Sequence, residues 1–135
     1  KKEGDLKTPV GTFELGKIYY RPDRVEKPFS KLQTTIIKKN MGWCDDPKSK
    51  YYNKLIKIKK SLKINYETLY RKDNKYDIFI LIKYNLKKIF KNKGSAIFLH
   101  LTKNYLPTKG CIAVSKKDFL ILLKLINKKT KIKIT

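Results

Sequence analysis

A histidine and a cysteine eleven positions apart could form a nucleophilic pair in this chain. His100, the only histidine, lies in an apolar segment, and Cys111 follows Lys109 and Gly110. A thiol reacts as the thiolate, and imidazole is the side chain whose ordinary pKa suits removal of its proton near neutral pH. Gly110 would let the backbone approach a substrate and leave its N–H free for an oxyanion, while Lys109 would add positive potential. The pattern indicates acyl transfer by cysteine, and the alternative is a core histidine with a buried structural cysteine.

Two apolar segments are expected to position this pair. Residues 76–84 are nearly all apolar, which is typical of a strand buried on both faces. Residues 96–101 (AIFLHL) predict a second central strand, and this strand carries His100. A loop over residues 102–107 and a return segment would then bring Cys111 back beside His100.

Most of the remaining chain also predicts extended structure. Short runs rich in β-branched and aromatic residues are expected to be strands, at residues 12–15, 18–20, 34–37 and 131–135. Residues 42–47 (GWCDDP) predict a turn that Trp43 orders. Residues 51–69 have an ambiguous period and predict irregular structure with short strands or a helix.

One helix is expected near the end of the chain. Ser115 and Asp118 fit a capping box, in which Ser115 is the N-cap. The apolar residues that follow have a helical period, which ends at Asn127. The fold class is therefore mainly β with one or two packed helices.

Length and composition favour a single globular domain. The chain has 135 residues, 41% hydrophobic and 12% aromatic, which excludes a disordered chain despite 33% charged residues. No apolar run approaches the roughly 18 residues of a membrane span. Two cysteines exclude a disulfide-rich scaffold, although one bond between Cys44 and Cys111 is compatible with an oxidising compartment. The first residues lack the apolar segment of a signal peptide.

The charge of the chain is strongly positive. Lysine and arginine number 34 against 11 acidic residues, for a formal net charge of +23. Such a surface attracts polyanions, including nucleic acid, anionic lipid and acidic cell-wall polymer. Arginine, which suits phosphate and base contacts, occurs only at positions 21, 24 and 71. The abundance of Lys, Ile, Asn and Tyr is equally typical of an AT-rich genome, so the charge has two explanations.

Several blocks of sequence, in a fixed order along the whole chain, carry a resemblance to a known family. The blocks are residues 3–13 (EGDLKTPVGTF), 20–24 (YRPDR), 42–47 (GWCDDP), 51–53 (YYN), 76–77 (YD), 94–100 (GSAIFLH) and 107–111 (PTKGC). Together they resemble the L,D-transpeptidase catalytic domain (YkuD-like) family, and within it the branch of small stand-alone cell-wall proteins. The resemblance implies one catalytic domain over residues 1–135, with an L,D-transpeptidase-like β-sandwich or barrel fold. The first block begins inside that fold, which leaves open a further N-terminal strand and a signal.

The resemblance implies a cysteine nucleophile and a reaction on peptidoglycan. Cys111 would attack the L-to-D peptide bond of a stem tetrapeptide, expel D-alanine and form a thioester. An amine of a second stem would resolve the thioester and make a 3–3 cross-link. His100 would move the proton, and the carbonyl of Leu101 would fix its tautomer, as a carboxylate does in other triads. The N–H groups of Gly110 and Cys111 would form the oxyanion hole.

The chain departs from the broader family at the active-site block. Lys109 occupies the place of a histidine before the glycine, and Ala113 occupies the place of a polar residue that holds substrate. The distance in sequence from His100 to Cys111 is also shorter. We interpret these features as typical of the branch. Substrate carboxylates would then be held by basic and polar residues elsewhere, with Thr108, Lys109, Arg21 and Arg24 as candidates, although Lys109 is equally explained as a solvated charge.

Other motifs have structural explanations. Residues 7–9 (KTP) predict a turn into a strand, and Trp43 with its acidic neighbours predicts a structural hub. Asp45 and Asp46 lack the further ligands that a metal requires, so no metal and no cofactor are expected. Alternating Tyr and Lys at residues 50–54 and 66–75 resemble a stacking surface for single-stranded nucleic acid, but both residue types are abundant throughout.

The expected partners follow from these interpretations. Peptidoglycan stem peptides are the expected substrate, with anionic cell-wall polymer as a further partner, no specific nucleic acid and a monomeric state. The expected location is the bacterial cell envelope, periplasmic or otherwise extracytoplasmic. Two alternatives stay open: an L,D-carboxypeptidase that uses water as acceptor, and a non-catalytic basic domain that binds polyanions.

Overall fold

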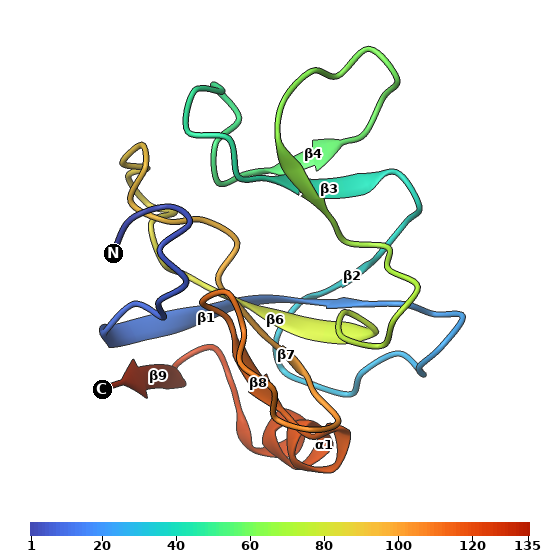
Figure 1. Cartoon of the computed structure of the whole chain (residues 1–135). Helices are drawn as coiled ribbons and strands as arrows, with labels where there is room; N and C mark the ends of the chain where they lie inside the picture. Colours follow the sequence, from blue (N-terminus) through green and yellow to red (C-terminus); the bar gives the residue numbers. More distant parts are fainter.

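A mixed sheet of six strands forms the centre of the molecule (Figure 1). The computed structural model describes residues 1–135. Along the sheet the strands follow the order β2, β1, β6, β7 and β8, and β9 pairs with the first half of β1. The pairs β1–β2 and β7–β8 are parallel, and the others are antiparallel. The bounds are β1 (Gly11–Tyr20), β2 (Thr34–Ile36), β6 (Ile78–Ile82), β7 (Phe98–Leu101), β8 (Ile112–Val114) and β9 (Lys131–Ile134).

A small sheet and a helix cover the two faces of the central sheet. The small sheet has the order β4-β3-β5 and is antiparallel, with β3 at Met41–Cys44, β4 at Leu55–Lys57 and β5 at Tyr66–Thr68. The helix α1 spans Lys116–Leu125. In Figure 1 the small sheet lies above the central sheet and α1 lies below it.

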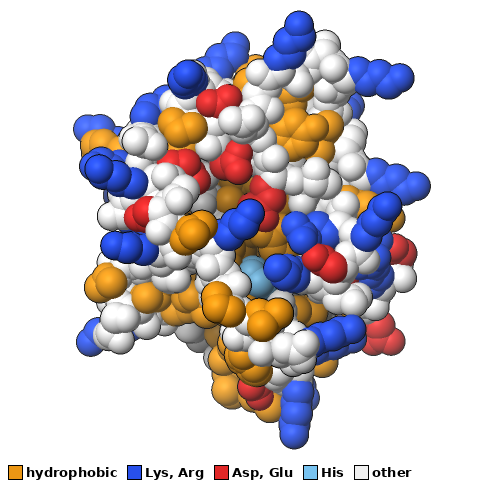
Figure 2. Space-filling model, viewed as in Figure 1, with side chains coloured by type: hydrophobic (Ala, Val, Ile, Leu, Met, Phe, Trp, Pro, Cys, Tyr) orange, Lys and Arg blue, Asp and Glu red, His pale blue; other side chains and the backbone are white.

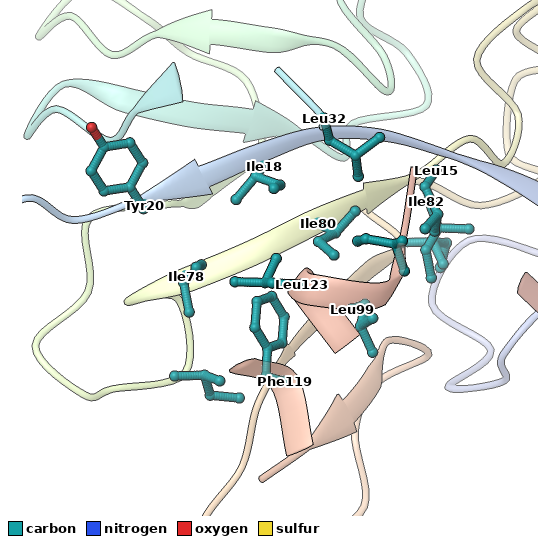
Figure 3. Close-up of a cluster of buried hydrophobic side chains, with 13 residues drawn as sticks. Leu15, Ile18, Tyr20, Leu32, Ile78, Ile80, Ile82, Leu99, Phe119 and Leu123 are labelled. Atoms are coloured by element: carbon teal, nitrogen blue, oxygen red, sulfur yellow. The ribbon is translucent and has the colours of Figure 1, made fainter. Parts of the chain in front are cut away.

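The central strands are buried on both faces, as the apolar run at residues 76–84 predicted. On one face, Ile78, Ile80 and Ile82 pack against the α1 side chains Phe119 and Leu123 (Figure 3). On the opposite face, a second cluster holds mainly aromatic side chains, among them Tyr19, Trp43, Tyr76, Phe79 and Phe98. The side chains of successive strand residues alternate between the two clusters, because a β-strand has a period of two.

The helix begins where the sequence predicted. The Ser115 hydroxyl accepts a hydrogen bond from the backbone N–H of Asp118 at 3.2 Å, which confirms the capping interaction. Phe119 and Leu123 are buried, whereas Leu125 is 71% exposed. The apolar face of α1 therefore closes one side of the domain. No helix has the length and apolar character that a membrane span requires.

Two segments differ from the sequence-based expectation. Residues 42–47 were expected to form a turn, but Gly42, Trp43 and Cys44 lie in β3, the middle strand of the small sheet. Pairing with β4 and β5 stabilises this strand, and such pairing depends on residues far along the chain. The two expected strands at 12–15 and 18–20 are one strand, β1, with an irregular register between Leu15 and Ile18.

Truncation of Phe119 should weaken the domain strongly. The ring is fully buried between α1 and the sheet, so Phe119→Ala should lower the free energy of unfolding by about 3–5 kcal/mol. Urea unfolding followed by circular dichroism would measure this. Leu125→Ala is the matched control on the same helix, and it should change the free energy by less than about 0.5 kcal/mol. Equal losses in the two variants would contradict this role of α1.

Candidate active site

The parallel pairing of β7 with β8 brings Cys111 back to the strand that carries His100. The register places Leu99 opposite Ile112 and His100 opposite Ala113. Cys111, one residue before β8, therefore lies level with Phe98, and the Phe98 N–H points at its sulfur across 3.4 Å. The loop between the strands returns the chain as the sequence predicted.

The thiol and the imidazole lie on the same side of the central sheet. Phe98 and His100 are two residues apart on β7, so their side chains share one face. Tyr76 lies over both, with its ring centroid 5.6 Å from that of Phe98 and 5.4 Å from that of His100. Cys111 packs against the same aromatic cluster. Tyr76 is thus a shared neighbour of the candidate nucleophile and the candidate base.

The sulfur of Cys111 points inward in this structure. Its thiol donates to the carbonyl of Ala96 at 3.2 Å and accepts the N–H of Phe98 at 3.4 Å. No hydrogen bond joins it to His100. Burial raises the pKa of the Cys111 thiol to about 12, against a smaller opposite effect of the Phe98 N–H. The structure therefore describes a protonated, resting thiol.

The tautomer of His100 is set by the backbone. Its Nδ1 lies 2.9 Å from the carbonyl oxygen of Leu101, and a carbonyl only accepts, so Nδ1 carries the proton. The lone pair of Nε2 is then free to accept a proton. Burial lowers the pKa of His100, with further lowering by the nearby charges of Lys75 and Arg71. The imidazole is therefore neutral at pH 7, as a general base must be.

A cavity of about 460 Å³ opens at His100. Its lining includes Thr108, Ala113 and three lysines, Lys75, Lys103 and Lys116. Cys111 does not line it, which agrees with the inward position of the sulfur. The imidazole is visible from this side between hydrophobic and basic side chains (Figure 2). A larger cavity, of about 870 Å³, lies along β1 and contains none of the candidate catalytic residues.

The residues before Cys111 are held by their own chain. The Thr108 hydroxyl donates to the carbonyl of Cys111 and accepts the Gly110 N–H at 3.3 Å. Gly110 has φ +132°, and a Cβ there would lie 2.9 Å from the carbonyl oxygen of Lys7. The need for glycine at position 110 is thus explained by the close approach of its backbone to Lys7, and not by an approach to a substrate. The N–H of Gly110 is not free here, whereas that of Cys111 has no partner in the protein.

The two candidate arginines are engaged by protein groups. Arg21 is buried and donates to both carboxylate oxygens of Asp23, at 2.8 and 2.7 Å, and to the carbonyl of Arg71 at 2.9 Å. Arg24 forms an ion pair with Asp77 at 2.9 Å. These contacts hold the segment at residues 71–77, part of which lines the cavity beside His100. Neither guanidinium lines the cavity itself, and each is already paired with a carboxylate of the protein.

Lys109 is exposed and belongs to a group of charges around the site. Its positive charge lowers the pKa of both Asp45 and Glu67, although burial raises the pKa of each carboxyl by more. One carboxylate oxygen of Asp45 is buried without a hydrogen-bond partner. Acidic side chains are visible on the same face as the imidazole (Figure 2).

Sequence reasoning missed two residues of this site. The Tyr76 hydroxyl donates to the Glu67 carboxylate and faces the Cys111 sulfur, where it favours the thiolate. Tyr76 is the first residue of the strand predicted over residues 76–84. Its position at the start of a central strand could therefore have been inferred from the sequence. Glu67 lies on β5, in a segment without a clear sequence pattern, and only tertiary structure brings it here.

Both cysteines are free thiols, and Cys44 is fully buried. The interpretation of Cys44 as a small buried residue fits this position, and no bond to Cys111 is formed. No group of three or more His, Cys, Asp or Glu side chains is placed to hold a metal ion.

A comparison with known families gives one match. The family model described as L,D-transpeptidase catalytic domain, YkuD, matches residues 1–134. No curated protein and no solved structure matches the chain.

The single histidine allows a direct test of the site's electrostatics. Because burial and the charges of Lys75 and Arg71 disfavour imidazolium, the NMR titration midpoint of His100 should lie below 6.5. Lys75→Gln should raise this midpoint, because it removes a neighbouring positive charge. Lys133→Gln on β9 is the matched control and should leave it unchanged. A midpoint at or above 6.5 would contradict a buried, neutral base.

Proposed function

Because this chain belongs to the L,D-transpeptidase catalytic domain (YkuD) family over essentially its whole length, we propose that it is a cysteine-dependent peptidoglycan L,D-transpeptidase. One observation supports the proposal above the others. The parallel β7–β8 pair puts a thiol and a neutral imidazole on one face of the sheet, with Tyr76 beside both. A nucleophile and a base in one site are what acyl transfer through a thioester requires.

The first half of the proposed reaction is acylation. Cys111 attacks the carbonyl carbon of the L-to-D bond in a stem tetrapeptide, and His100 Nε2 takes the thiol proton. The carbon–nitrogen bond then breaks, and His100 returns the proton to the amine of the leaving D-alanine. The carbonyl oxygen of Leu101 accepts a hydrogen bond from Nδ1 throughout and stabilises the imidazolium. The free N–H of Cys111 is the candidate donor to the oxyanion.

The second half transfers the acyl group. The side-chain amine of a second stem attacks the thioester and loses a proton to His100. Its nitrogen forms the new amide bond, the sulfur–carbon bond breaks, and the thiol is regenerated with the proton from His100. The product is a 3–3 cross-link.

The resting position of the thiol implies a movement before acylation. With a thiol pKa of about 12 and a lowered imidazole pKa, proton transfer in the resting site is strongly uphill. We infer that the Cys111 side chain leaves the Ala96 carbonyl and turns toward Nε2 when substrate binds. Hydrogen bonds of this kind commonly tighten only in the substrate complex.

The cavity beside His100 suits an anionic substrate. Lys75, Lys103 and Lys116 line it, and Lys109 lies exposed on the loop before the nucleophile. Asp73 and Asp77 also line it, but each is paired with an arginine, Arg71 and Arg24 respectively. Stem peptides carry carboxylates, which these ammonium groups and the Thr108 hydroxyl would hold. Arg24 supports the wall from behind through its ion pair with Asp77, and Arg21 holds the start of the same segment through the carbonyl of Arg71. We place the enzyme in the bacterial cell envelope, where its charge of +23 would retain it on anionic wall polymer.

Replacement of the nucleophile tests the proposal. Cys111→Ala should abolish formation of the acyl-enzyme on a stem tetrapeptide, measured as a mass increase of the intact protein. Cys44→Ala is the matched control, because Cys44 is the other cysteine and is buried in β3. His100→Gln should slow acylation by roughly 100-fold or more. Turnover by Cys111→Ala, or acylation of Cys44, would overturn the proposed role of Cys111. No acylation and no turnover of stem peptides by the wild-type protein would favour a non-catalytic basic binding domain.

The fate of the thioester is measured by its products. With stem tetrapeptide alone, mass spectrometry should detect a cross-linked dimer in an amount that grows with the concentration of acceptor stem. An amine acceptor competes with water according to its concentration and its hold in the site. Tripeptide without dimer at any acceptor concentration would show that the enzyme is an L,D-carboxypeptidase instead.

A further inference from the structure

A carboxyl group and a hydroxyl group that the proposed reaction does not use lie against the candidate nucleophile. Glu67 comes from β5 of the small sheet, opposite Trp43 in register. Tyr76 comes from the residues just before β6 and is 5% exposed. The Tyr76 hydroxyl donates to Glu67 and faces the sulfur of Cys111. Three separate segments of the chain thus meet around one tyrosine hydroxyl.

The hydroxyl has one proton and two neighbours that compete for it. An ionised carboxylate is a strong acceptor, and a charge-assisted hydrogen bond to it is about twice as strong as a neutral one. A thiolate at Cys111 would need the same proton for its own stabilisation, in addition to the N–H of Phe98. The negative charge of Glu67 also disfavours a thiolate nearby.

The charges around these groups come from several elements. Asp45, directly after β3, acts on Glu67, and so does Lys109 from the loop before Cys111. Arg71 acts on it from the segment before Tyr76. Lys75 acts on the thiol from that same segment. These basic residues offset part of the negative charge, and burial raises the pKa of Glu67. The Glu67 carboxyl is therefore poised to titrate above its ordinary range.

We propose that Glu67, acting through the Tyr76 hydroxyl, is a positioning residue that keeps the Cys111 thiol protonated in the resting enzyme. While Glu67 is ionised, it holds the Tyr76 proton and adds a like charge beside the sulfur. When Glu67 is neutral, the hydroxyl can donate to the thiolate instead. The inference rests on the proposed function only in that it takes Cys111 as the nucleophile.

The proposal predicts a particular pH dependence of thiol reactivity. Below the pKa of Glu67 the carboxyl is neutral, and the logarithm of the alkylation rate of Cys111 should rise by one per pH unit. As Glu67 ionises, the thiolate becomes harder to form, so the curve should flatten before it rises again. Such an inflection is the signature of two coupled titrations.

The test is the rate of iodoacetamide alkylation of Cys111 between about pH 4 and pH 9, with the modified residue identified by peptide mass mapping. Wild-type protein should show the inflection, and Glu67→Gln should give a straight line. Above the inflection the variant should react about tenfold faster, which corresponds to one pKa unit, and below it the two rates should agree. Glu14→Gln, which removes an exposed carboxylate on β1, is the matched control and should keep the wild-type curve.

A merely structural effect gives a different result. If Glu67→Gln only loosened the site, alkylation would be faster by one factor at every pH and the inflection would remain. That outcome, or a curve identical to wild type, would overturn the proposal. Urea unfolding of each variant shows whether the fold is retained.

Tyr76→Phe tests the part of the hydroxyl. Without the hydroxyl, the thiolate loses the donor that it has while Glu67 is neutral, so alkylation should be slower below the inflection and the inflection itself should shrink. Glu67→Gln added to Tyr76→Phe should then have less effect than it has alone, as expected for groups that act as a unit. An inflection of full size in Tyr76→Phe would overturn the role of the hydroxyl.

The measurement needs no peptidoglycan substrate, so it is separate from the test of function. If Cys111→Ala still processes stem peptides, the proposed function fails while the alkylation curves remain valid. If Cys111 forms the acyl-enzyme but the inflection is absent, the function stands and the role of Glu67 fails.

Discussion

The parallel pairing of β7 with β8 is the constraint on which the site depends. Parallel neighbours normally need a crossover of a dozen or more residues, usually through a helix. Here the chain crosses through the short stretch between Leu101 and Ile112. The end of that stretch is fixed by the Thr108 hydroxyl on the Cys111 carbonyl and by the close approach of Gly110 to Lys7. A fixed loop end gives the backbone of Cys111 one position relative to the imidazole.

The two cores give this pair its environment. The cluster that α1 covers supplies most of the buried aliphatic area, and the cluster below the small sheet is mainly aromatic. Trp43 contacts Phe98 edge to face, with centroids 5.4 Å apart, and Tyr76 covers Phe98 and His100. This aromatic layer covers the sulfur and one side of the ring. Burial therefore raises the pKa of one group and lowers that of the other, which keeps both neutral at rest.

The electrostatics of the site differ from those of the chain as a whole. A chain with a net charge of +23 has carboxyl groups, Glu67 and Asp45, close to its candidate nucleophile. The lysines lie instead around the cavity at His100, where a substrate's carboxylates would enter. A positive entrance attracts an anionic peptide at long range, while local negative charge holds the thiol unreactive until it is engaged. The net charge of the chain thus acts on the approach of a substrate, whereas the carboxyl groups near Cys111 act on the pKa of its thiol.

The sequence by itself determined the strands of the central sheet, the helix and the family. Local signals suffice for these: a doubly apolar run becomes β6, Ser115 caps α1, and ordered motifs match the family along residues 1–134. Tertiary structure alone decided that residues 42–44 form a strand, that Arg24 pairs with Asp77, and that Glu67 reaches the thiol through Tyr76. These contacts join residues that no local pattern relates, because long-range strand pairing fixes them. The catalytic roles of His100 and Cys111 stay predictions, made from residue type and family and now given a geometry.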